Sequence, residues 1–285
     1  MGLSEVFHIV LIAIGLTLLR LFLNAVIFKP IPKWFKIVKH DADKFPESAW
    51  KALYYSVAWG WAVYLCIFSE EQYFFKLGHH WTKIVPGITV EPSLYWLYML
   101  QMGFYAHCVY ASVFIETIRR DFTVLMIHHF LTLGLLSFSY AVRFHFIGLL
   151  VLFVQDIGDV SLEVSKCVLY FKTRNGKDHK LPEFLANISF AIFTIQWVLF
   201  RLYWFPTKVL YSTSYIGIKI YPGGPFYLPF NIMLMVLYAM QVYWFTFIVK
   251  VLVRVLSGKE VSDTRETKED EAARAKSVQL EKKKN

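Results

Sequence analysis

The chain has 285 residues, and its composition is strongly apolar, with 56% hydrophobic and 18% aromatic residues. A soluble domain of this length does not carry so much apolar surface, so a lipid bilayer is the expected solvent. The net charge of +9 is spread over short loops and a tail, which argues against a nucleic-acid-binding surface and fits contact with anionic lipid headgroups.

Seven apolar stretches are long enough to cross a membrane, which takes about 20 helical residues for ~30 Å of hydrocarbon. They lie at 6–28, 50–69, 95–118, 122–142, 146–170, 185–205 and 227–254. The first stretch contains Arg20 and is not followed by a small-residue cleavage site, so we expect a retained helix rather than a cleaved signal peptide. The sequence therefore predicts an all-α membrane protein with about seven transmembrane helices in one bundle.

The basic residues of alternate loops indicate the orientation of these helices. The first, third and fifth loops hold Lys29, Lys33, Lys36, Lys39, Lys44, Arg119, Arg120, Lys172, Arg174, Lys177 and Lys180. The other loops hold only Lys76, Lys83, Arg143, Lys208 and Lys219. Because cytosolic loops carry the excess of Lys and Arg, we expect a lumenal amino terminus and a cytosolic carboxyl terminus.

The chain divides into three parts. Residues 1–43 hold the first transmembrane helix and a basic connector, whose Trp34 and Phe35 we expect at the membrane interface. Residues 44–256 form one domain with six transmembrane helices. Residues 257–285 are almost wholly polar and lack aromatic side chains, so we expect a disordered, charged cytosolic tail.

Ionisable residues inside two neighbouring helices predict a site, because each costs roughly 3 kcal/mol or more to insert and so faces a bundle interior. His128 and His129 follow Asp121 closely in the fourth helix, which places them about 11 Å into the membrane at 1.5 Å per residue. The fifth helix carries Asp156 and Asp159. Since a short turn joins the two helices, they pack antiparallel and can bring imidazoles and carboxylates together.

A histidine held by an aspartate suits acyl transfer. The carboxylate fixes the imidazole tautomer and leaves the other ring nitrogen free as a base or a nucleophile. Two other interpretations stay open here. Polar residues in membrane helices often serve only as interhelical hydrogen-bonding partners. Zinc or iron would also use His and Asp ligands, but only one histidine pair lies near the carboxylates, so we expect no metal.

The residues around this site resemble a known family. Residues 119–142 read RRDFTVLMIHHFLTLGLLSFSYAV, and residues 148–166 read GLLVLFVQDIGDVSLEVSK. These stretches are similar to the Lag motif of the TLC-domain ceramide synthases. The likeness extends to KFPESAWK at 44–51 and RLYWFPTKV at 201–209 and covers most of the chain. Gln155 differs from the histidine that the family commonly has before the first aspartate.

The resemblance implies a multi-pass acyltransferase of the endoplasmic reticulum membrane. Such an enzyme transfers a fatty acyl group from acyl-CoA to the amine of a sphingoid long-chain base, giving ceramide or dihydroceramide and CoA. Acyl-CoA is the co-substrate, and we expect no separate cofactor. The family motif implies as catalytic residues His128, His129, Asp156 and Asp159.

Basic residues at the cytosolic mouth are expected to bind the phosphates of CoA. These residues are Arg119, Arg120 and Lys166. The two arginines can instead be flanking charges that set topology, and Lys166 can form an ion pair within its helix with Glu163.

The main alternative is a non-catalytic TLC-domain protein, such as a lipid sensor or a chaperone, which would not need both the His and the Asp pairs. A transporter or a receptor is less well supported, because the sequence lacks paired broken helices. The expected partners are acyl-CoA, a sphingoid base and membrane lipids, without nucleic acid. A homodimer or heterodimer and the acyl-chain length stay open.

Overall fold

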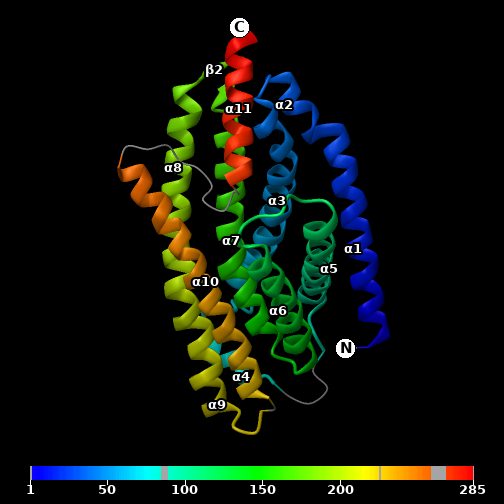
Figure 1. Ribbon diagram of the computed structural model, residues 1–285. Coiled ribbons are helices and arrows are strands. Elements are labelled where there is room, and N and C mark those ends of the chain that lie inside the picture. Colours follow the sequence, from blue (N-terminus) through cyan, green and yellow to red (C-terminus); the bar gives the residue numbers. More distant parts are fainter. Residues whose placement is uncertain (1, 85–88, 225, 258–267, 285) are drawn as a thin grey trace.

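The computed structural model describes residues 2–84, 89–224, 226–257 and 268–284, and nearly all of them are helical. The helices and two short strands are α1 (Leu3–Leu23), η1 (Asn24–Phe28), α2 (Pro30–Trp34), α3 (Lys39–Val63), η2 (Tyr64–Phe68), α4 (Leu77–Thr82), α5 (Pro92–Phe114), α6 (Phe122–Ala141), α7 (His145–Tyr170), β1 (Thr173–Arg174), β2 (Lys177–Asp178), α8 (Lys180–Gln196), η3 (Trp197–Leu210), η4 (Ser212–Ile216), α9 (Gly217–Ile220), α10 (Tyr227–Leu256) and α11 (Lys268–Lys284). The long helices lie side by side in one elongated bundle (Figure 1).

Four helical stretches of the described chain are long and apolar enough to cross a membrane. They are Leu3–Trp34, Phe122–Ala141, Lys180–Ile220 and Tyr227–Val255. Together with the helical content, they confirm the prediction of an all-α membrane protein. The other three predicted stretches also form helices, as α3 with η2, α5 and α7.

Helix α7 lies at the centre of the bundle, with α8 and α10 on one side and α5 and α1 on the other (Figure 1). Every residue from Phe146 to Gly158 is buried. An apolar run on all sides of a helix is typical of a helix with neighbours all round, and α7 packs against α3, α6, α8 and η3. This central helix carries Asp156 and Asp159 into the interior.

Close approach of α1 to α5 depends on Gly103. A Cβ atom added there would lie 2.5 Å from Cγ2 of Ile12 on α1. Small residues let membrane helices approach in this way, because their association relies on close packing rather than on the hydrophobic effect. Gly103 therefore fixes the position of the first helix on the bundle.

Two expectations from the sequence differ from the structure. The stretch predicted at 185–205 belongs to a longer helical segment from Lys180 to Ile220, in which Pro206 lies within η3. Pro206 has no backbone N–H to donate, and the helix continues past it with π-helical geometry rather than ending.

The prediction that the tail is wholly disordered is wrong, because Lys268–Lys284 form helix α11. Nε of Arg274 on α11 lies 3.1 Å from Oδ1 of the buried Asp41 on α3, and Asp270 lies 3.9 Å from Lys44. These ion pairs give the polar segment a docking site that its composition does not reveal. The remaining tail positions, 258–267 and 285, lie outside the described residues.

Candidate active site

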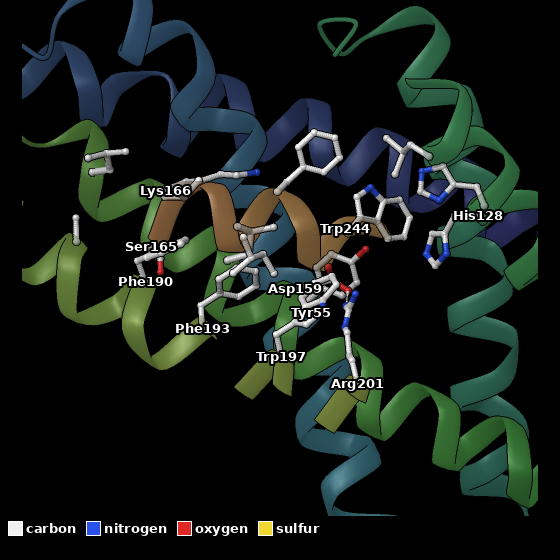
Figure 2. A pocket seen from close by; sticks show the side chains of 18 residues that line it. Tyr55, His128, Asp159, Ser165, Lys166, Phe190, Phe193, Trp197, Arg201 and Trp244 are labelled. Carbon is white, nitrogen blue, oxygen red and sulfur yellow. Dashed lines mark hydrogen bonds and ion pairs between the residues drawn. The ribbon is translucent and has the colours of Figure 1, made fainter. Parts of the chain in front are cut away.

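A largely apolar, partly open cavity of about 150 Å³ lies between α6, α7, α8, η3 and α10 (Figure 2). Its walls are mostly aromatic and aliphatic, with polar side chains distributed among them (Figure 2). The polar lining residues are Tyr55, His128, His129, Asp159, Ser165, Lys166 and Arg201. The cavity therefore combines space for an apolar chain with a small set of chemically active side chains.

The two predicted histidines project from the first turns of α6 into this cavity. His129 is only 6% exposed, and His128 packs edge-on against Trp244 at 5.2 Å between ring centroids. Tyr105 lies against both imidazoles. Nδ1 of each histidine is buried without a hydrogen-bond partner among the described residues. Each ring is thus positioned by aromatic packing, and its Nδ1 makes no hydrogen bond within the described chain.

The two predicted aspartates are placed differently from each other. Asp156 is fully buried and accepts a hydrogen bond from Nε2 of Gln101 at 2.6 Å. Asp159 faces the cavity and accepts from Nη2 of Arg201 at 2.7 Å. Neither imidazole hydrogen-bonds to these carboxylates within the described chain, so the expected Asp–His pair is not formed here.

Arg201 is the site residue that sequence reasoning missed. It lies on η3, is 3% exposed, and its guanidinium packs 4.1 Å from the ring centroid of Trp197. Nη2 also donates to the backbone oxygen of Gln155 at 2.7 Å. A signal was present, because a lone arginine inside an apolar membrane stretch is costly and needs partners.

The three basic residues predicted for the CoA phosphates have different surroundings. Lys166 lines the cavity and pairs with Glu163 at 2.8 Å, which confirms the ion pair within this helix. Arg119 lies 2.6 Å from Glu47 of α3, whereas Arg120 is exposed. Only Lys166 of the three lines the cavity.

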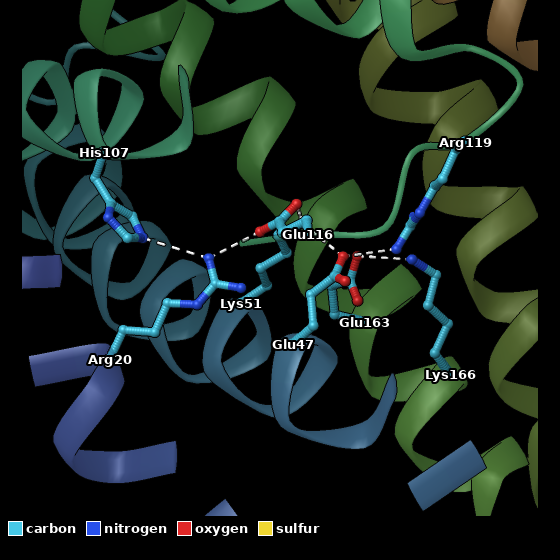
Figure 3. A network of polar contacts seen from close by, with 8 residues as sticks. All are labelled: Arg20, Glu47, Lys51, His107, Glu116, Arg119, Glu163 and Lys166. Atoms are coloured by element: carbon cyan, nitrogen blue, oxygen red, sulfur yellow. Dashed lines mark hydrogen bonds and ion pairs between the residues drawn. The ribbon is translucent and has the colours of Figure 1, made fainter. Parts of the chain in front are cut away.

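A buried ionic network lies next to these residues (Figure 3). Glu116 accepts from Nη1 of Arg20 at 2.8 Å and from Nζ of Lys51 at 2.7 Å, and Lys51 also reaches Glu47 at 2.9 Å. The network joins α1, α3 and the segment after α5. A second, smaller cavity beside it shares His129 and Asp159 with the first. His129 thus lines both cavities, whereas His128 lines the first.

No group of three or more His, Cys, Asp and Glu side chains suited to a metal ion occurs among the described residues. The arrangement instead provides imidazole nitrogens within apolar walls, beside a fixed guanidinium. In such a setting an imidazole can accept a proton or attack a carbonyl carbon. A cation fixed nearby can stabilise negative charge that develops on the carbonyl oxygen.

The chain is similar to known proteins over almost its full length. Residues 44–250 match the TLC domain. The chain is 40% identical to ceramide synthase 1 of Homo sapiens, over 98% of this chain and 80% of that protein. It is 39% identical to ceramide synthase 1 of Mus musculus, over 99% and 83%. Identity to ceramide synthase LOH2 of Arabidopsis thaliana is 34%, over 94% of both.

Proposed function

The chain belongs to the TLC-domain family, and from this membership we propose that it is a ceramide synthase. It transfers a fatty acyl group from acyl-CoA to the amine of a sphingoid long-chain base. A bond forms between the amine nitrogen and the carbonyl carbon, and the carbon–sulfur bond of the thioester breaks. The proton lost by the nitrogen is taken up by the departing CoA thiolate, so the products are an N-acyl sphingoid base and CoA.

One observation carries this function, namely that His128 and His129 line an apolar cavity together with Asp159. An acyl chain needs an apolar cavity, and its thioester needs a base or a nucleophile at the end of that cavity. Either histidine can deprotonate the attacking ammonium or accept the acyl group covalently before the amine attacks. We assign His128, His129, Asp156 and Asp159 to the catalytic centre.

The phosphates of CoA are proposed to bind at the basic mouth formed by Arg119, Arg120 and Lys166. Arginine offers paired N–H donors to phosphate oxygens. Arg120 is exposed, so its replacement by Gln leaves the buried ion pairs intact. Arg120→Gln is expected to raise KM for acyl-CoA several-fold, with kcat unchanged. An acyl-pantetheine thioester, which lacks the nucleotide phosphates, should show no change; an equal rise in KM for both substrates argues against phosphate binding.

The membrane topology belongs to the same proposal. We propose seven spans, formed by the four apolar stretches together with α3, α5 and α7, a lumenal amino terminus and a cytosolic carboxyl terminus. The support is that the amino terminus and α11 lie at opposite ends of the bundle (Figure 1), and that Lys and Arg concentrate in alternate loops. A multi-pass location in the endoplasmic reticulum membrane fits the lipid substrates.

The experiment that tests the function is an N-acylation assay with the purified full chain in lipid vesicles. Acyl-CoA and sphinganine are supplied together, and the N-acyl product is quantified by mass spectrometry. An alkyl amine of the same chain length without hydroxyl groups serves as the matched control substrate. We expect N-acyl sphinganine with release of one CoA per product. Absence of product across a series of acyl-chain lengths contradicts the function and favours a non-catalytic TLC-domain protein.

A further inference from the structure

Arg201 is a buried cation in the wall of the cavity that holds the histidines (Figure 2). It comes from η3, whereas the histidines come from α6 and the aspartates from α7. Its side chain points toward Asp159 rather than toward solvent or lipid. The chain therefore places a permanent positive charge in the wall of a largely apolar cavity.

The guanidinium is held on three sides. Nη2 donates to Asp159 and to the backbone oxygen of Gln155, both at 2.7 Å, and the indole of Trp197 covers one face. Gly158 provides the third support, because a Cβ there would lie 3.0 Å from Nε of Arg201. Gly158 directly precedes Asp159 on α7. Because it has no side chain, the guanidinium can lie close to the helix backbone.

Much of the hydrogen-bonding capacity of Arg201 is unused. A guanidinium has five N–H donors, and the two bonds made by Nη2 leave three. Within the described chain, Nε is buried without a partner, and no hydrogen bond involves Nη1. A fixed, buried cation with spare donors in the wall of a cavity calls for an acceptor oxygen from a ligand.

The proposed reaction supplies such an oxygen. When the amine or a histidine attacks the thioester, a bond forms to the carbonyl carbon and the π electron pair moves onto the carbonyl oxygen. That oxyanion returns its electron pair when the carbon–sulfur bond breaks and the thiolate leaves. Both routes to the product pass through this charge, so a donor for it serves either of them.

We propose that Arg201 is a further catalytic residue, whose unused N–H groups bind the carbonyl oxygen of the acyl thioester as it becomes an oxyanion. This inference rests on the acyltransferase function proposed above. Gly158 then acts as a positioning residue, and Asp159, besides its proposed place in the catalytic centre, orients the guanidinium.

The test compares four variants of the full chain in lipid vesicles. Arg201→Gln removes the charge, and Arg201→Lys keeps it without the fork of donors. Gly158→Ala keeps Arg201 but forces it to move by a few tenths of an ångström. Gly60→Ala is the matched control, because a Cβ at this helical glycine meets nothing within 4 Å.

We expect kcat of Arg201→Gln to fall by about 10²–10³-fold, as on loss of an oxyanion donor, with KM for acyl-CoA within about threefold. Arg201→Lys should recover part of this loss. Gly158→Ala should lose about tenfold in kcat through misplacement of the guanidinium, and Gly60→Ala should match the wild type.

Two results overturn the proposal for Arg201. One is a folded Arg201→Gln protein with kcat within threefold of the wild type, and the other is a loss confined to KM. If Arg201→Gln does not fold, kcat and KM of Arg201→Lys and Gly158→Ala test the proposal by the same criteria. If the wild type itself forms no N-acyl product, the proposed function is wrong, and this outcome is distinct from a failure of the Arg201 proposal alone.

Discussion

Replacing Glu116 by Gln tests the ionic network that joins the first helix to the bundle. Glu116 accepts from both Arg20 and Lys51, and the three side chains are only 7%, 3% and 15% exposed. The substitution keeps the shape of the side chain but removes the negative charge. Two buried cations then face each other without their shared carboxylate (Figure 3).

The expected loss follows from this burial. Removing one partner of a buried ion pair costs about 3–5 kcal/mol, because the remaining charge stays desolvated. Glu71→Gln is the matched control, since Lys83 lies 2.7 Å from Glu71, the same distance as Lys51 from Glu116. These control side chains are 42% and 34% exposed, and an exposed pair contributes less than about 1 kcal/mol.

The assay is thermal unfolding of the full chain in detergent, with every variant scanned at one rate because unfolding of such proteins is often irreversible. At about 2–4 °C per kcal/mol, we expect Tm of Glu116→Gln to fall by about 10 °C. Tm of Glu71→Gln should stay within about 3 °C of the wild type. Equal shifts for the two variants would refute the reasoning, because burial would then not decide the contribution of the pair.

Two further predictions concern the half of the bundle opposite α11. Burial lowers the pKa of His80 to about 4, below the ~6.5 of a histidine in an unfolded chain. The buried neutral imidazole therefore stabilises the fold fully above pH 6.5, and this stabilisation is lost as the pH falls toward 4. We expect a loss of about 2 kcal/mol at pH 5, and His80→Gln should flatten the dependence of Tm on pH; an unchanged slope contradicts it. In Gly148→Ala the new Cβ would overlap the hydroxyl of Tyr98, so unfolding should become easier by about 1–3 kcal/mol, and a Tm equal to the wild type would show that the helices can separate freely.

The sequence was sufficient for the helices because apolar runs of membrane length have few alternatives. Each predicted stretch coincides with helix, and Glu163 and Lys166 pair as their spacing in one helix predicts. The continuation past Pro206 was not predictable in this way. A proline normally ends a helical pattern, and the wider turns of η3 depend on packing that the local sequence does not reveal.

The site could be predicted only in part. His128, His129 and Asp159 do line one cavity, because costly polar groups on adjacent helices must face an interior. The partners could not be predicted, since the rotation of each helix decides them. Asp156 accepts a hydrogen bond from Gln101 on α5, and Asp159 accepts one from Arg201 on η3. Those partners come from helices that are distant in the chain.

The rate of N-acyl sphinganine formation by histidine variants tests the central claim most directly. His128→Ala and His129→Ala remove the two cavity imidazoles, and His8→Ala is the control, because His8 on α1 pairs with the hydroxyl of Tyr95 away from the cavity. We expect at least one cavity variant to lose about 10²–10⁴-fold in rate while its Tm and the activity of His8→Ala stay near the wild type. Undiminished product formation by both folded cavity variants would contradict the account.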